Sequence, residues 1–477
     1  MNKRSGRAHG TRLPSTRTLH VHEPRRPPGV ERLPQRRGRS RHVRTPADRP
    51  AGRGAARRAG SARGRAPRQR SHAGRGARER RPGARARRPR PPPRRAARRA
   101  PAARRGADVS AAVKPIGVGV IGASPGATWA TLAHLPALAA LPAYRLVAVS
   151  TTKQASADET ARRFGVPRAF DEAAPLIEHP EVDLVVVSVR APEHAPLVRA
   201  ALAAKKQVFC EWPVGPSAAD TTELAALARE AGVRTVAGLQ RRFAPGVTHL
   251  RRLLHEGYLG ALRSIHVHGA VPLLGARRER ARAYTADVEN GANALHTMTA
   301  HFLDAALSVV GDPASFSALV ARQFSETTIE ETGEVIPVTA PDQIAVVGAL
   351  RSGAILSVRI EAGKRNGSNV TWTLTGTEGD VEVGHDFSLR GARGDGQPLA
   401  PIAVPESDAA PPTGELSDDA RQVAELYAAF AGASTHPLVP TFDDAARLRR
   451  LLEALVESSE TGRRVEWPPA DGRGGAP

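Results

Sequence analysis

The chain has 477 residues, enough for two or three domains, and a formal net charge of +23. A single cysteine, Cys210, excludes an internal disulfide framework and is typical of a protein that works in a reducing cytoplasm. No run of about 18 apolar residues occurs, which excludes a membrane-spanning helix, so we expect a cytoplasmic protein with no membrane partner.

The positive charge is concentrated at the amino-terminal end. Residues 1–110 carry 35 Lys and Arg but only 5 Asp and Glu, and they contain no Ile, Phe, Tyr or Trp. Such a segment cannot bury enough apolar surface to offset its chain entropy, so the sequence predicts disorder over residues 1–112. The rest of the chain, with 35 basic and 42 acidic residues, is mildly acidic and requires no nucleic-acid partner.

Two interpretations of this arginine-rich segment stay open. It is either a basic arm that binds nucleic acid or an acidic partner, or GC-rich message translated upstream of the true start. The composition favours the second interpretation, in which the protein begins at Val109 or Val113. A nucleic-acid partner is therefore expected only if the segment is real.

From residue 113 to residue 240, short apolar β-branched runs alternate with helical patterns. Five or six strands that alternate with helices predict a doubly wound parallel sheet, the Rossmann arrangement. Ligands bind such sheets at the edge formed by the carboxyl ends of the strands. The expected strands are 116–123, 144–150, 182–189, 207–213 and 234–240.

After Gln240 the pattern changes. A helix over 246–257 and a long helix over 292–310 accompany strand-like segments joined by turns short enough for antiparallel pairing. We therefore expect a second, α+β domain over 241–470, with an open, mostly antiparallel sheet that serves substrate binding and oligomerisation. Residues 471–477 form a tail. The expected strands of this domain are 262–271, 315–324, 342–350, 354–363 and 369–383.

The loop after the first strand has small residues where a dinucleotide fingerprint needs them. Gly122, Ser124 and Ala127 occupy the first, third and sixth places of a degenerate G-x-G-x-x-G motif. Small residues there allow a tight turn, close approach of the backbone to a pyrophosphate, and close packing of the next helix. The position after the first strand of a βαβ unit predicts a dinucleotide site.

The end of the second strand bears on cofactor choice. An NAD-selective site has an acidic residue there to bind the ribose 2′-hydroxyl, but this chain has Ser150, Thr151, Thr152 and Lys153. Hydroxyl groups and a lysine suit a 2′-phosphate, which favours NADP as the cofactor, with NAD as the alternative. An equal interpretation is that the two threonines only cap the next helix.

From residue 113 to about residue 467 the chain resembles the glucose–fructose oxidoreductase/inositol dehydrogenase (Gfo/Idh/MocA) family. It is most similar to the branch that contains the fungal galactose-regulon repressor and its bacterial oxidoreductase relatives. The resemblance implies an NAD(P)-dependent oxidoreductase that acts on a sugar, sugar acid or cyclitol, and a homo-oligomer. The motifs that carry it are segments 119–138, 189–194, 208–215, 238–245, 290–307, 340–350 and 372–380.

Two of the three catalytic positions that the resemblance implies are changed. The lysine of the family's E-K-P segment corresponds to Trp212, whose indole accepts no proton. The family's D-x-x-x-H helix motif places an acid and a histidine on one helix face, and here the pair is Thr297 and His301. His301 alone remains as a general base near neutral pH.

The resemblance also implies further cofactor contacts. Glu211 and Pro213 flank Trp212 around the nicotinamide, His194 packs beneath the cofactor, and Gln240 faces the cleft between the two domains.

Other polar residues of the second domain are weaker candidates. His296 lies about 140° from His301 on an α-helix and is expected to point elsewhere. Tyr284 and Asp287 face either substrate or solvent. The scattered His, Asp and Glu residues do not have metal-ligand spacing, so no metal site is expected.

The pattern supports two functions. The first is hydride transfer between a nicotinamide cofactor and a polyol, with His301 accepting the hydroxyl proton. The alternative is a non-catalytic, dinucleotide-sensing regulatory protein that resembles the galactose-regulon repressor, which the loss of the lysine and the acid would explain. We favour the first.

Overall fold

The computed structural model describes residues 114–126, 128–405, 416–432 and 436–468. The arginine-rich segment, both candidate start residues, Ala127 and the carboxyl-terminal tail lie outside these ranges. None of the helices within the ranges is both long and apolar enough to span a bilayer.

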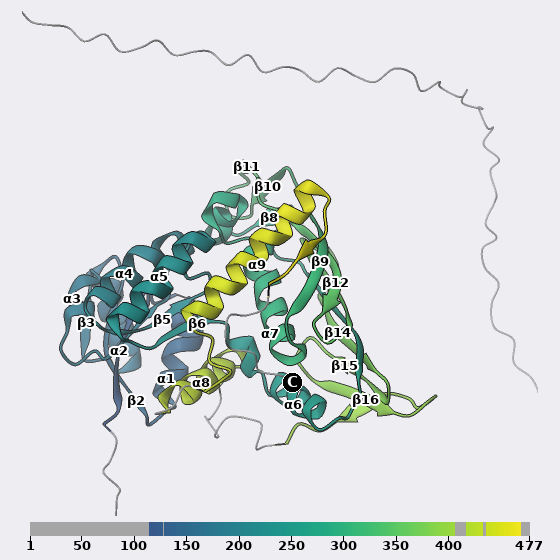
Figure 1. The fold of residues 1–477 in the computed structure, drawn as a ribbon. Coiled ribbons are helices and arrows are strands. Elements are labelled where there is room, and N and C mark those ends of the chain that lie inside the picture. Colours follow the sequence, from purple (N-terminus) through teal and green to yellow (C-terminus); the bar gives the residue numbers. More distant parts are fainter. Residues whose placement is uncertain (1–113, 127, 406–415, 433–435, 469–477) are drawn as a thin grey trace, which may run out of the picture. The chain divides into compact units, whose positions relative to one another are not determined.

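The first half of the described chain forms a parallel sheet in the order β3-β2-β1-β4-β5-β6 (Figure 1). This order confirms the predicted doubly wound sheet. It places the loops after β1, β2, β4, β5 and β6 at one edge. The strands are β1 (Ile116–Ile121), β2 (Tyr144–Ser150), β3 (Arg168–Phe170), β4 (Leu184–Val187), β5 (Gln207–Glu211) and β6 (Thr235–Gly238).

Apolar side chains on both faces of each strand explain why this sheet is covered on both sides. On β1, Val118 and Val120 pack with one helical layer while Ile121 packs with the other. The helices here are π-helix η1 (Ala130–His134), α1 (Leu135–Ala139), α2 (Gln154–Phe164), α3 (Ala174–Glu178), 3-10 helix η2 (Ala191–Glu193), α4 (His194–Ala203), α5 (Ala218–Ala231) and 3-10 helix η3 (Gln240–Phe243).

The second sheet has the order β17-β16-β15-β14-β7-β13-β12-β9-β18. All pairs are antiparallel except β7 with β13, which confirms the expected open, mostly antiparallel sheet. A small sheet, β11-β10-β8, was not predicted. The strands are β7 (Leu262–Val271), β8 (Arg277–Arg278), β9 (Pro313–Ala321), β10 (Glu326–Ile329), β11 (Val335–Pro337), β12 (Gln343–Leu350), β13 (Ile355–Ala362), β14 (Asn369–Gly376), β15 (Gly379–Val383), β16 (Leu389–Arg393), β17 (Ala400–Ile402) and β18 (Val465–Glu466).

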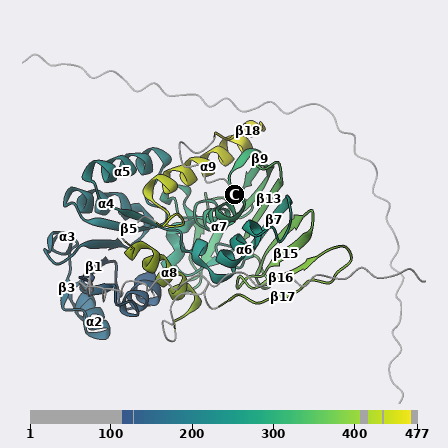
Figure 2. The ribbon, with the colours of Figure 1, turned by 60° about the horizontal axis from the view of Figure 1, so that its bottom comes forward.

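Helices cover only one face of the large sheet (Figure 2). The other face leaves Leu319, Val347 and Ile355 more than half exposed. The helical segments of this half are α6 (Pro245–His255), 3-10 helices η4 (Arg280–Ala286) and η5 (Val288–Asn290), π-helix η6 (Ala294–Thr299), α7 (Ala300–Val310), α8 (Asp418–Ala431) and α9 (Phe442–Thr461).

The last two helices return to the first sheet. Helix α8, which was not predicted, buries Val423 and Tyr427 in the core cluster that also contains Val118 and Phe209. Helix α9 runs beside α5 and β9 (Figure 1) and begins with a capping box between Thr441 and Asp444. The boundary at residue 240 stays a prediction, because chain from beyond it completes the packing of the parallel sheet.

Candidate functional site

The turn after β1 can be formed only by glycine at its first position. Gly122 has φ +92°, and a Cβ there would lie 2.2 Å from the carbonyl oxygen of Ser188. The amides of Gly122 and Ala123 donate to the Ser150 carbonyl at 2.9 and 3.2 Å. The half-buried Ser124 continues the turn, its amide donating to the Gly122 carbonyl at 3.0 Å. The backbone thus makes the tight turn that a dinucleotide fingerprint requires.

The end of β2 lies against this turn. Ser150 is buried, while Thr151 accepts from the Lys153 amide at 3.2 Å and donates to the Lys153 carbonyl at 2.8 Å. Lys153 occupies the N-cap of α2 without a side-chain cap, so neither threonine caps that helix. Thr152 and Lys153 are exposed at the carboxyl edge of the sheet.

His194 fixes the segment that follows β5. Its Nδ1 lies 2.7 Å from the Pro213 carbonyl and its Nε2 3.1 Å from the Val189 carbonyl. Burial lowers the pKa of His194, so the neutral ring carries one N–H, which donates to one of these two carbonyls. The peptide bond between Trp212 and Pro213 is cis. His194 therefore connects the loop after β4 to the loop after β5.

Glu211 belongs to a buried chain of hydrogen bonds that sequence analysis missed. His134 Nε2 donates to Glu211 Oε1 at 2.9 Å, and the Tyr427 hydroxyl lies 2.8 Å from His134 Nδ1. Burial raises the pKa of Tyr427, so its hydroxyl keeps the proton and donates it. The Glu211 carboxylate also packs against Gly238, where a Cβ would lie 2.6 Å away. The network fixes the end of β5 to η1 and α8.

Trp212 connects the end of β5 to the second half of the chain. Its side chain is 6% exposed, and its indole N–H donates to the backbone carbonyl of His296 in η6. Because the only polar hydrogen of the indole is used in this bond, Trp212 has no donor left for a substrate.

The region around His301 differs from the α-helix that the sequence suggested. Residues Ala294–Thr299 form a π-helix, so the 140° separation expected between His296 and His301 does not apply. The hydroxyl of Thr297 donates to the Asn293 carbonyl at 2.6 Å, within its own helix.

Both histidines of this region are poor bases. Burial lowers the pKa of His296 to about 3, assisted by the Arg449 cation, and burial together with Arg241 lowers the pKa of His301 to about 3. Their Nδ1 atoms are buried and lack a hydrogen-bond partner among the described residues. Each ring is therefore neutral at neutral pH.

Acid should destabilise the fold through His296. Its folded pKa lies below the value of about 6.5 for an unfolded chain, so below pH 7 the unfolded state binds more protons and stability falls. We expect the wild type to lose ~2 kcal/mol more unfolding free energy between pH 7 and pH 5 than a His296→Gln variant does. Urea unfolding at both pH values measures this. The exposed His255→Gln should behave as wild type, and an equal loss in all three proteins would contradict the prediction.

Segment η3 brings three polar side chains to the end of β6. Gln240 is buried and its Oε1 lacks a partner within the described ranges. Arg241 lies over the ring of Phe302. Arg242 binds Asp304 on α7 through two bonds, Nε to Oδ2 at 2.7 Å and Nη2 to Oδ1 at 2.5 Å. Arg241 and the pair of Arg242 with Asp304 were not singled out from the sequence, although the segments that contain them were.

The two weaker candidates contact different partners. Tyr284 packs under Arg190, whose guanidinium carbon is 5.4 Å from the ring centroid, so it connects η4 to the loop after β4. Asp287 accepts from the Glu289 amide and the Thr339 hydroxyl, both at 3.1 Å, as a local cap. No group of three or more His, Cys, Asp or Glu side chains suited to a metal occurs in the described part of the chain.

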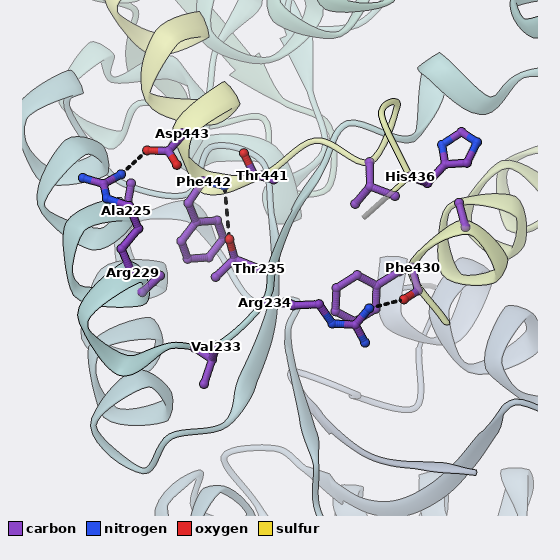
Figure 3. A pocket seen from close by; sticks show the side chains of 13 residues that line it. Ala225, Arg229, Val233, Arg234, Thr235, Phe430, His436, Thr441, Phe442 and Asp443 are labelled. Atoms are coloured by element: carbon purple, nitrogen blue, oxygen red, sulfur yellow. Dashed lines mark hydrogen bonds and ion pairs between the residues drawn. The ribbon is translucent and has the colours of Figure 1, made fainter. Parts of the chain in front are cut away.

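A cavity of about 380 Å³ lies elsewhere (Figure 3). It is lined by Arg234 and Thr235 at the amino end of β6, and by Phe430 and Phe442. Because ligand-binding loops of such sheets follow the carboxyl ends of strands, this cavity lies at the opposite edge from Gly122 and Gln240.

Comparison with known proteins agrees with this geometry. A family model described as an oxidoreductase family with an NAD-binding Rossmann fold (Gfo/Idh/MocA) matches residues 116–239, and one for the Gal80p carboxyl-terminal domain matches residues 245–384. The galactose/lactose metabolism regulatory protein GAL80 of Kluyveromyces lactis is 26% identical over 57% of this chain and 64% of its own length. The dehydrogenase aclE of Aspergillus oryzae is 27% identical over 73% of this chain and 98% of its own length.

Two solved structures share the fold. A super-repressor mutant of Gal80p from Saccharomyces cerevisiae superimposes with a TM-score of 0.67 at 22% identity, covering 74% of this chain and 97% of that one. Levoglucosan dehydrogenase in complex with NADH and L-sorbose gives a TM-score of 0.66 at 20% identity, covering 75% of this chain and 100% of that one.

Proposed function

Because the chain belongs to the Gfo/Idh/MocA oxidoreductase family, in the branch that contains Gal80, we propose that it is an NAD(P)-dependent oxidoreductase that acts on a sugar, sugar acid or cyclitol. The turn at Gly122 is the observation that carries the proposal, since no other residue type fits its φ and its contact with Ser188. A bound nicotinamide would supply the hydride chemistry.

In this proposal the residues after β1 and β2 hold the cofactor. Gly122 and Ser124 let the backbone approach the pyrophosphate, and Ser150 and Thr151 shape the turn beside them. The exposed Thr152 and Lys153 would receive a 2′-phosphate, which supports NADP, with NAD as the alternative. Levoglucosan dehydrogenase, which shares the fold, binds NADH, so both dinucleotides must be tested.

His194, Glu211, Trp212 and Pro213 shape the nicotinamide end of this site. Their hydrogen bonds hold the loops after β4 and β5 in place and leave the indole as an apolar wall. Gln240 Oε1 and His301 Nδ1 are both buried without a partner among the described residues, so each can accept a hydrogen bond only after substrate binding opens its surroundings. His301 would accept the hydroxyl proton on its imidazole, although its low pKa makes it a weak base in the free protein.

The test is a fluorescence titration of the full chain with NADPH and NADH, followed by a screen of sugars, aldonates and cyclitols for dinucleotide reduction. We expect saturable quenching, turnover of at least one polyol, and a loss of ~100-fold or more in kcat for His301→Asn with unchanged dinucleotide affinity. The exposed His255→Asn is the matched control. Failure of both dinucleotides to bind would refute the proposal.

A second function is favoured by two contacts. Where the family has a lysine and an acid, Trp212 donates to a backbone carbonyl and the Thr297 hydroxyl donates within its own helix. Neither side chain offers a group for proton transfer. A protein that binds the dinucleotide but turns over no polyol, and whose His301→Asn variant binds normally, would be a dinucleotide-sensing regulator. Domain limits, homo-oligomer formation and cytoplasmic location stay predictions.

A further inference from the structure

Arg241 is a cation with no carboxylate in direct contact among the described residues, and Asp419 acts on it only as a nearby charge. Its guanidinium carbon lies 5.1 Å from the centroid of the Phe302 ring and 5.7 Å from that of Phe387, so the half-buried group contacts two aromatic rings. No carboxylate forms an ion pair with it in the ranges that the structure describes, whereas the neighbouring Arg242 binds Asp304 through two bonds. Burial lowers the pKa of Arg241 and the charge of Asp419 offsets this only in part, so an anion in direct contact would stabilise the cation further.

The topology places Arg241 away from the phosphates of a dinucleotide. The turn proposed for the pyrophosphate follows β1, and the position proposed for the ribose follows β2. Arg241 follows β6, which is the last strand at the opposite end of the strand order from β2. Its neighbours there are Gln240 and His301, each with a buried polar atom that lacks a partner among the described residues. These are the groups assigned above to the substrate.

We propose that Arg241 binds a carboxylate of the substrate, which makes that substrate a sugar acid rather than a neutral sugar or cyclitol. The inference rests on the proposed function and deepens it. A guanidinium offers a planar pair of donors that matches a carboxylate.

The same contact would improve His301 as a base. Burial and the positive charge of Arg241 hold the pKa of His301 down to about 3. A carboxylate paired with Arg241 would offset that charge, so the imidazole would gain part of its basicity when a sugar acid is bound, while the effect of burial remains. His301 would then take the hydroxyl proton of the substrate, and a bound oxidised dinucleotide would supply the hydride acceptor.

The experiment compares matched ligand pairs in the full chain. Thermal shift and calorimetry, with and without NADPH, are run with D-galacturonate against D-galactose and with D-gluconate against D-glucitol. We expect at least one acid to bind ~10-fold or more tightly than its neutral partner. Arg241→Gln should abolish this difference, and Arg241→Lys should keep part of it. Arg145→Gln, which removes an exposed arginine paired with Glu181, should leave it unchanged.

The ligand-free melting temperature of each variant shows whether it is folded. The inference is overturned if no acid binds, if acids and neutral partners bind equally, or if Arg241→Gln keeps the preference. It is also overturned if inorganic phosphate competes with the sugar acid for binding as strongly as the acid itself does, because the site would then recognise negative charge and not a carboxylate. Dinucleotide binding is scored separately, so failure here leaves the cofactor proposal intact.

Discussion

Replacing Gly122 with alanine should lower dinucleotide affinity by ~100-fold or more, because charge-assisted bonds from backbone amides to a phosphate contribute about 1.5–3 kcal/mol each. An alanine Cβ would lie 2.2 Å from the Ser188 carbonyl oxygen, a backbone atom that cannot rotate away, and φ +92° is unfavourable for any side chain. The turn must therefore open, and the backbone that follows it leaves the position in which it would meet the pyrophosphate.

Gly126 provides a matched control in the same loop. A Cβ there would meet nothing within 4 Å, and its φ is not positive, so Gly126→Ala should bind the dinucleotide as the wild type does. Fluorescence titration with NADPH and NADH gives both affinities, and the melting temperatures separate lost binding from lost folding. Equal affinities for the two variants would show that the turn after β1 does not hold the cofactor.

The parallel sheet could be predicted because the sequence patterns that specify it lie close together in the chain. The apolar run of β1 ends at a glycine, and each strand is followed by a helix pattern within a few residues. The central strands of the second sheet could be predicted as well, since short turns such as that between β12 and β13 imply antiparallel pairing, whereas the outer strands β16, β17 and β18 were not predicted. Helix α8 was not predicted. It packs through Tyr427 onto His134, 293 residues earlier, and such a pairing leaves no local signal.

The candidate site, like the fold, could be predicted only where nearby residues specify it. Sequence reasoning found that Trp212 stands where relatives have a lysine, but only the structure shows its N–H bound to a carbonyl 84 residues later. The low pKa of His301 is likewise invisible in the sequence, because it results from burial and from Arg241, which lies on η3, 60 residues earlier in the chain. The π-helix of η6 also invalidated an angle calculated for an α-helix. The residues that form the candidate site could be predicted from the sequence, whereas their hydrogen-bond partners and neighbouring charges could not.

Removal of the Asp304 carboxylate should give the largest stability change that we predict. Asp304 and Arg242 are largely buried and share two hydrogen bonds. Asp304 raises the pKa of Arg242 above its usual range, although burial alone would lower it. An arginine keeps its proton at neutral pH even without this partner, so the cation persists when Asp304 is replaced. Breaking such a pair leaves an uncompensated buried charge, and Asp304→Asn should reduce the unfolding free energy by about 3–5 kcal/mol.

Two further variants show whether the buried charge is the cause. Asp443→Asn removes an aspartate from an exposed pair with Arg229 and should cost no more than ~1 kcal/mol. A double variant, Arg242→Met with Asp304→Leu, removes both charges and should be more stable than Asp304→Asn. Urea unfolding measures all three. Equal losses for the two single variants would contradict the argument.

The same pair connects stability to substrate choice. Arg242 holds η3 against α7, and η3 also carries Gln240 and Arg241, while α7 carries His301. The double variant Arg242→Met with Asp304→Leu should largely keep the fold. It replaces the two hydrogen bonds between η3 and α7 with an apolar contact, so Arg241 is no longer fixed relative to His301. We therefore expect the double variant to bind NADPH normally and to lose most of its preference for the sugar acid over the neutral sugar. A retained preference would mean that the aromatic rings of Phe302 and Phe387 alone position the guanidinium.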